Sequence, residues 1–163
     1  MGGIALLAVA LIWVVSGTLE QRVINAGDTA PKFSITTDQG RTVSLDNFGG
    51  KILVLNFWAT WCEPCIEEIP TLNAFQRTMA DQGVVVLGVS VDRNEKLYRR
   101  FLDRAHLSFP TALDSEANIS ASYGTFQFPE TYIIDRSGKV VEKLISNQNW
   151  MDPELLARVR RLL

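Results

Sequence analysis

The sequence predicts an α/β sandwich in which helices cover a mixed central β-sheet. Two near-continuous apolar runs, 51–58 (KILVLNFW) and 84–91 (VVVLGVSV), have the length and composition of strands buried on both faces. Between them, apolar residues recur at helical spacing and predict a helix over 62–81. Strands that alternate with helices favour a parallel sheet, and a closing hairpin would make that sheet mixed.

Two β-hairpins are expected, one on each side of this central part. The runs 33–36 and 42–45 flank a Gly-containing turn and predict an N-terminal hairpin. The runs 131–135 and 139–144 are joined by Asp-Arg-Ser-Gly, which is a turn sequence, and predict the closing hairpin.

Three more helices complete the expected order. Apolar residues on one face predict a helix over 94–105, and a shorter one is expected at 115–123. Asp152 and Pro153 suit the N-cap and first position of a last helix. Pro70 is expected to kink the long helix, because proline removes an interior hydrogen bond.

An uncharged apolar segment precedes this domain. Residues 1–19 contain no charge, and a helix of about 18 residues would rise roughly 27 Å, just short of a hydrocarbon core. A membrane anchor, a signal peptide and a buried core helix are the alternatives. We favour the anchor because residues 15–18 match a cleavage site poorly, although no Lys or Arg precedes the run. Residues 20–29 are then expected to be a linker, and 30–163 one domain.

The charge of the chain excludes one class of partner. The formal net charge is −2, and basic residues form no stripe. Nucleic acid is therefore not expected as a partner.

Two cysteines carry the chemistry that the sequence predicts. Cys62 and Cys65 are the only cysteines, and they lie three residues apart at the expected start of the long helix. Free N–H groups and the helix dipole favour an anion there, and the thiolate is the form that attacks a disulfide. The position also follows the carboxyl end of a buried strand, where ligands bind in open α/β sheets.

Other interpretations of the pair are weaker. A disulfide closing so short a loop contributes little stability, and zinc normally takes four ligands whereas the chain has one histidine, His106. A redox dithiol is therefore favoured over a structural disulfide, a metal site or two inert thiols, and no metal ligand is predicted.

Two motifs resemble a known family. The segment 56–70 (NFWATWCEPCIEEIP) resembles the active-site strand and helix of thioredoxin-fold proteins, and 129–141 (PETYIIDRSGKVV) resembles their TlpA/ResA/CcmG-like branch. The resemblance covers about residues 30–162. It implies a thioredoxin-like sandwich with a helical insert at about residues 94–123. It also implies an exported, membrane-anchored bacterial thiol–disulfide oxidoreductase on the periplasmic side. Such a protein would reduce a protein substrate such as apocytochrome c, with electrons from a membrane thiol carrier and with no cofactor besides a redox-active Cys62–Cys65 disulfide.

The resemblance also suggests acidic residues for proton transfer. Asn56 stands where cytoplasmic thioredoxin has a buried Asp, so another acid should take that role. Glu68, six residues after Cys62, and Glu130 are the catalytic candidates, and Glu63 is a weaker one. Each could equally be a solvated surface carboxylate.

The expected substrate site lies around the dithiol. The resemblance places a cis peptide bond before Pro129, which would direct the backbone of Phe128 toward an incoming peptide. Trp61, Glu63, Pro64, Phe128 and Pro129 are the predicted substrate-binding residues. Two further aromatic residues, Trp58 and Phe126, are expected to belong to the core rather than to this groove.

Three other functions remain open at this point. The same dithiol could serve an oxidant or isomerase, because the sequence does not fix the reduction potential. A metal chaperone could use the two sulfurs. A peroxidase is disfavoured because Thr60 lies two residues before Cys62 and not three, so the usual Pro-x-x-x-Thr-x-x-Cys pattern is absent.

Overall fold

The computed structural model describes residues 23–163. The apolar segment 1–19 and the first residues of the predicted linker lie outside the described residues. Between residues 23 and 163, no helix combines the length and the hydropathy needed to cross a membrane.

A five-stranded mixed sheet forms the centre of the domain, in the order β5-β4-β3-β6-β7. Its strands are β3 (Ile52–Trp58), β4 (Val84–Ser90), β5 (Thr111–Leu113), β6 (Glu130–Ile134) and β7 (Val140–Ile145). The first three are parallel to one another, and β6 and β7 are antiparallel to their neighbours. The predicted α/β sandwich with a mixed sheet is therefore confirmed.

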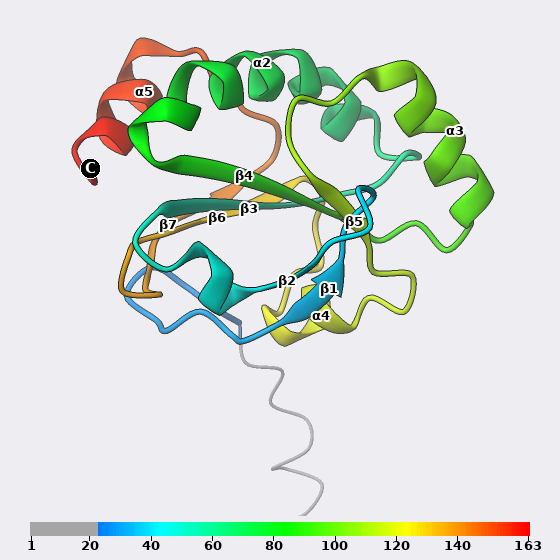
Figure 1. Cartoon of the computed structure of the whole chain (residues 1–163), viewed down its shortest axis with the longest axis horizontal. Helices are drawn as coiled ribbons and strands as arrows, with labels where there is room; N and C mark the ends of the chain where they lie inside the picture. The colour runs from blue at the N-terminus through cyan, green and yellow to red at the C-terminus, as the bar shows by residue number, and fades with distance from the viewer. Residues whose placement is uncertain (1–22) are drawn as a thin grey trace, which may run out of the picture.

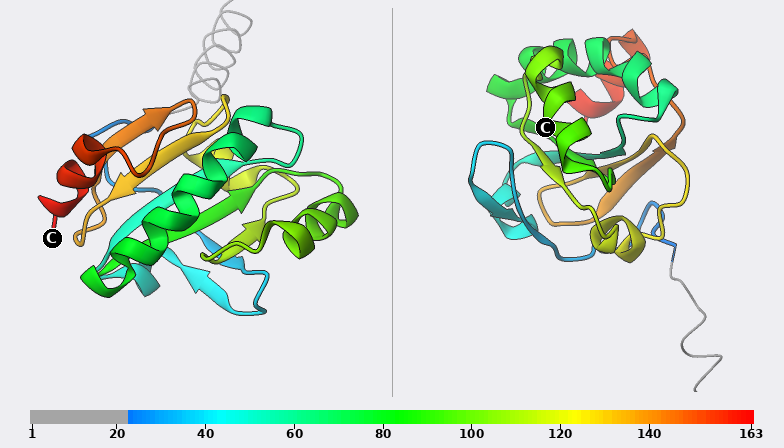
Figure 2. Two further views of the ribbon diagram at one scale, coloured as in Figure 1. Left: turned by 90° about the horizontal axis from the view of Figure 1, so that it is seen from above. Right: turned by 90° about the vertical axis from the view of Figure 1, so that its right-hand side faces the viewer.

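Helices and a small hairpin cover the two faces of the sheet (Figure 1). The longer helices α2 (Glu63–Met79), α3 (Glu95–Ala105) and α5 (Pro153–Arg160) lie on one side. The other side carries β1 (Ser34–Thr36), β2 (Thr42–Ser44), the 3₁₀ turn η1 (Leu45–Phe48) and the short helix α4 (Asn118–Ser122). A second 3₁₀ turn, η2 (Ala80–Gln82), follows α2, which continues through Pro70. Figure 2 shows the same layers from above and from one side.

The alternation of side chains along β3 divides the core into two apolar layers. Leu53, Leu55 and Phe57 pack on the side of β1, η1 and α4, whereas Ile52 and Val54 pack beneath α2 and α5. Asn56 is the one polar residue of this strand, and it is 3 % exposed. Burying an amide costs free energy unless it is hydrogen-bonded, so the side chain of Asn56 needs hydrogen-bond partners in the interior.

The strand β5 is absent from the elements that the sequence predicts. It pairs in parallel with Gly88–Ser90 at the edge of the sheet. Three residues after a proline carry too little periodicity to be recognised, and the strand exists because its neighbour β4 provides the hydrogen bonds.

Residues 24–30 run along the domain. The backbone N–H of Gly27 donates to the carbonyl oxygen of Val140 (2.7 Å), and that of Ala30 donates to the carbonyl oxygen of Gly138 (2.9 Å). The backbone N–H of Ile24 donates to the carbonyl oxygen of Tyr123 (3.0 Å). The described part of the predicted linker is therefore fastened to β7 and to the end of α4.

Candidate active site

The two cysteines lie at the start of α2, just after the carboxyl end of β3. Cys62 is the N-cap residue, and its sulfur accepts a hydrogen bond from the backbone N–H of Cys65 at 3.3 Å. The two sulfurs are joined in a disulfide of 2.10 Å. Cys62 is 6 % exposed and Cys65 only 1 %, so an external reactant meets Cys62 first.

A buried carboxylate fixes the loop that precedes Cys62. Asp92 accepts hydrogen bonds from the backbone N–H of Thr60 (2.9 Å), the hydroxyl of Thr60 (2.6 Å) and the hydroxyl of Ser90 (2.6 Å). The sequence analysis did not identify Asp92. Its position in the sequence could have identified it. Asp92 follows β4 just as the loop before Cys62 follows β3, and the carboxyl ends of two parallel strands lie at the same edge of the sheet.

The loop before β6 faces the dithiol. The Phe128–Pro129 bond is cis, as the resemblance implied, and Phe128 packs against the cluster that contains both cysteines. The rings of Trp61 and Phe128 meet edge to face at 5.9 Å, while 66 % of Trp61 stays exposed. An aromatic surface therefore lies beside the dithiol.

Trp58 and Phe126, both expected in the core, differ in burial. Trp58 belongs to the core, as predicted: it packs against Phe101, and its indole N–H donates to the hydroxyl of Thr111 at 3.3 Å. The prediction that Phe126 belongs to the core is wrong, because 70 % of this residue is exposed. A single aromatic residue in a loop has no periodicity from which its direction could be predicted.

Two predicted residues occupy the exposed side of the dithiol turn. Glu63 and Pro64 lie between the cysteines in the first turn of α2, and both are exposed. A substrate that reaches Cys62 can contact them.

Glu68 is buried on the α2 face of the sheet. Its Oε1 accepts a hydrogen bond from the side-chain amide of Asn56 (2.7 Å), and its Oε2 accepts from the backbone N–H of Gln148 (3.0 Å) and the indole N–H of Trp150 (3.2 Å). Burial raises the pKa of Glu68 above its ordinary value, and the three hydrogen bonds oppose part of that rise. On a helix, residues three apart share a face, so Glu68 lies one turn from Cys65.

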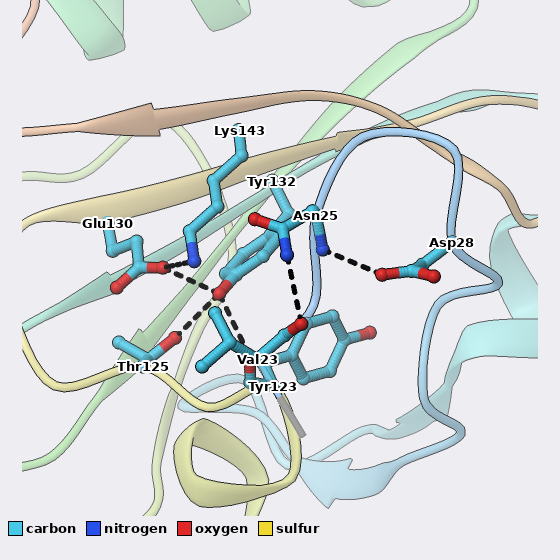
Figure 3. Close-up of polar contacts among 8 residues, drawn as sticks. All are labelled: Val23, Asn25, Asp28, Tyr123, Thr125, Glu130, Tyr132 and Lys143. Atoms are coloured by element: carbon cyan, nitrogen blue, oxygen red, sulfur yellow. Dashed lines mark hydrogen bonds and ion pairs between the residues drawn. The ribbon is translucent and has the colours of Figure 1, made fainter. Parts of the chain in front are cut away.

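Glu130 is buried on the opposite face (Figure 3). Its Oε1 lies 2.6 Å from the ammonium of Lys143 and accepts a hydrogen bond from the hydroxyl of Tyr132 at 2.6 Å. The Tyr132 hydroxyl also lies 3.1 Å from that of Thr125, in the loop that leads to Pro129. The structure thus places Glu68 and Glu130 in separate environments on the two faces of the sheet.

The described part of the chain offers few ligands for a metal. Within residues 23–163, no group of three or more His, Cys, Asp or Glu side chains is placed to hold a metal ion. The chemistry that the arrangement can perform is exchange between thiols and disulfides, with a buried acid one helical turn away.

Comparisons with known proteins agree with this geometry. The sequence profile described as the AhpC/TSA family matches residues 26–143. A thiol-disulfide oxidoreductase ResA from Bacillus cereus is 34% identical over 79% of this chain and 75% of its own length. The thioredoxin-like protein YneN from Bacillus subtilis is 40% identical over 72% of this chain and 69% of its own length.

Solved structures show the same fold. A thiol:disulfide interchange protein DsbE from Chlorobium tepidum superimposes with a TM-score of 0.79 at 28% identity. That alignment covers 85% of this chain and 98% of the other. The N-terminal hairpin and the mixed sheet belong to this shared thioredoxin-like architecture.

Proposed function

The chain belongs to the AhpC/TSA family and is a thiol–disulfide oxidoreductase, and we propose that it works as an exported reductant of disulfides in protein substrates. The observation that carries the proposal is the placement of Cys62 and Cys65 at the start of α2, beside the cis Pro129 and one turn from a buried acid.

Cys62 is the attacking residue in the proposed reaction. The N–H of Cys65 and the N-terminus of α2 favour a thiolate at Cys62 in the reduced protein. This thiolate attacks one sulfur of the substrate disulfide. A bond forms between Cys62 and that sulfur, the substrate S–S bond breaks, and the other substrate sulfur leaves as a thiolate.

Cys65 then resolves the mixed disulfide. The Cys65 thiol gives its proton to the carboxylate of Glu68, and the resulting thiolate attacks the sulfur of Cys62. The Cys62–Cys65 bond forms as the bond to the substrate breaks, and the second substrate sulfur leaves as a thiolate that takes up a proton. Two electrons have passed from the dithiol to the substrate.

The surroundings support a polypeptide as substrate. Trp61 and Phe128 offer aromatic surface beside the sulfurs, and Glu63, Pro64 and Pro129 border the same approach. The resemblance to the TlpA/ResA/CcmG-like branch suggests apocytochrome c as the protein reduced. A membrane thiol carrier would restore the dithiol, and residues 1–19 would anchor the domain on the extracytoplasmic side.

Single-cysteine variants test the assignment of roles. With a disulfide-containing peptide as substrate, Cys65→Ala should accumulate a mixed disulfide through Cys62, whereas Cys62→Ala should accumulate none. Non-reducing gels and mass spectrometry measure both. Equal trapping by the two variants would show that the roles are wrongly assigned.

The direction of electron flow is tested separately. The reduction potential of the dithiol, measured against glutathione, should lie toward about −270 mV, as for reductants of this fold. A potential near about −120 mV would instead make the protein an oxidant.

A further inference from the structure

Three donors from two parts of the chain converge on the carboxylate of Glu68. Asn56 lies on β3. The N–H of Gln148 and the indole of Trp150 both belong to the segment between β7 and α5. Each group donates, and none of them is charged. Such a cage suits an ionised carboxylate, because an ionised carboxylate only accepts hydrogen bonds and every group around Glu68 donates one.

Trp150 is firmly placed within this cage. Its side chain is completely buried and packs against Phe75 of α2, with ring centroids 5.2 Å apart. Its backbone N–H donates to the hydroxyl of Thr71 at 3.2 Å. The ring contact with Phe75 thus holds the indole, and the hydrogen bond to Thr71 holds the backbone of Trp150. The indole N–H donates to Glu68 from this position.

Apart from the two cysteines, the charged groups on the elements around Glu68 pair with one another or are exposed. Cys62 and Cys65 are the titratable groups on the adjacent turn of α2. Glu130 and Lys143 pair on the opposite face of the sheet, and Glu142 pairs with Arg158. The remaining charged side chains on α2 and α5 are exposed: Glu63, Glu67, Arg77, Asp152, Glu154, Arg160 and Arg161.

We propose that Trp150 is a positioning residue for thiol exchange, whose indole N–H holds the Glu68 carboxylate and thereby sets the pH range in which the dithiol reacts. The inference rests on the proposed function, because it requires Glu68 to accept the proton of Cys65. Burial already favours the protonated acid, so the loss of one donor leaves a smaller fraction of Glu68 ionised, and able to accept a proton, at low pH.

The test is the pH profile of a single turnover. The reduced protein is mixed with glutathione disulfide at a concentration above which the rate no longer rises, so that resolution by Cys65, and not attack by Cys62, limits the rate. The fraction of Cys62–Cys65 disulfide is followed by alkylation and mass spectrometry. Trp150→Phe keeps an aromatic ring and removes the N–H. Below the inflection of the wild-type profile its rate should fall about tenfold, and well above the inflection it should match the wild type.

A matched variant separates this effect from the loss of any buried indole. Trp58→Phe also removes an indole N–H that donates in the interior, but its partner is Thr111. Its profile should keep the wild-type inflection. An inflection displaced equally in Trp58→Phe and Trp150→Phe would overturn the inference.

Glu68→Gln distinguishes failure of the inference from failure of the proposed function. If the inflection persists in Glu68→Gln, Glu68 is not the proton acceptor and the proposed mechanism is wrong. If Glu68→Gln abolishes the inflection while Trp150→Phe leaves it in place, the mechanism stands and the role of Trp150 is overturned.

A measurement on the unmodified protein covers the case in which Trp150→Phe does not fold. The Nε1–H resonance of Trp150 in an ¹H–¹⁵N NMR spectrum should shift with pH along the same inflection as the rate. A resonance that does not move across that range would contradict the hydrogen bond on which the inference depends.

Discussion

Two of the buried carboxylates, Glu68 and Glu130, are compensated in different ways. Glu130, directly after the cis proline, is balanced by the ammonium of Lys143, whereas Glu68, one turn after Cys65, has only neutral donors. The ammonium of Lys143 compensates the buried charge of Glu130, whereas the neutral donors around Glu68 leave burial free to raise the pKa of Glu68. The pair of Glu130 and Lys143 is therefore suited to holding the loop before β6, and Glu68 is suited to exchanging a proton.

The largest effect should come from removing the cation. Lys143→Met leaves the carboxylate of Glu130 buried without its partner, and we expect a loss of about 3–5 kcal/mol in the free energy of unfolding. Urea unfolding followed by circular dichroism measures it. Lys143→Arg keeps the charge and should lose much less, so equal losses in the two variants would refute the countercharge.

A double variant sharpens the comparison. Glu130→Gln combined with Lys143→Met removes both charges, so the combined loss should be smaller than the sum of the single losses by about 2 kcal/mol. The corresponding cycle for Glu68→Gln and Trp150→Phe should give about 1 kcal/mol, because one partner is neutral. Coupling energies of equal size would remove the distinction between the two acids.

The pH dependence of stability should show the raised pKa of Glu68. Its pKa in the folded protein is raised, so folding favours the protonated form. The stability that Glu68 contributes is complete below its unfolded pKa and declines as the pH rises through the folded one. The stability of the wild type relative to Glu68→Gln should therefore decrease with rising pH, and a flat difference would contradict the raised pKa.

The smallest effect should come from the hydroxyl that links Glu130 to the loop. Tyr132→Phe removes the hydrogen bond to Glu130 but leaves Lys143 in place, and a loss of about 1 kcal/mol is expected. Thermal unfolding measures it. A loss as large as that of Lys143→Met would mean that the hydroxyl, and not the cation, balances the carboxylate.

The sequence predicted the parts of this fold that depend on local pattern. The two buried strands, the long helix after Cys62 and both hairpins follow from periodicity and turn residues. The strand β5 and the outward direction of Phe126 could not be predicted, because each depends on neighbours distant in the chain.

The same division applies to the site. The dithiol is a local signal, whereas the partners of Glu68 come from residues 12, 80 and 82 positions away. Spacing placed Glu68 near the cysteines, but nothing in the sequence joined it to Trp150. Likewise, Asp92 meets Thr60 only because β3 and β4 are parallel and end at the same edge.

A redox titration of the unmodified protein tests the central claim most directly. The protein is equilibrated in buffers with graded ratios of reduced to oxidised glutathione, and its free thiols are alkylated and counted by mass spectrometry. Cys62 and Cys65 should pass together from two alkylated thiols to none in a single two-electron transition. A pair that stays wholly alkylated or wholly protected in every buffer would contradict an exchange enzyme built on these two sulfurs.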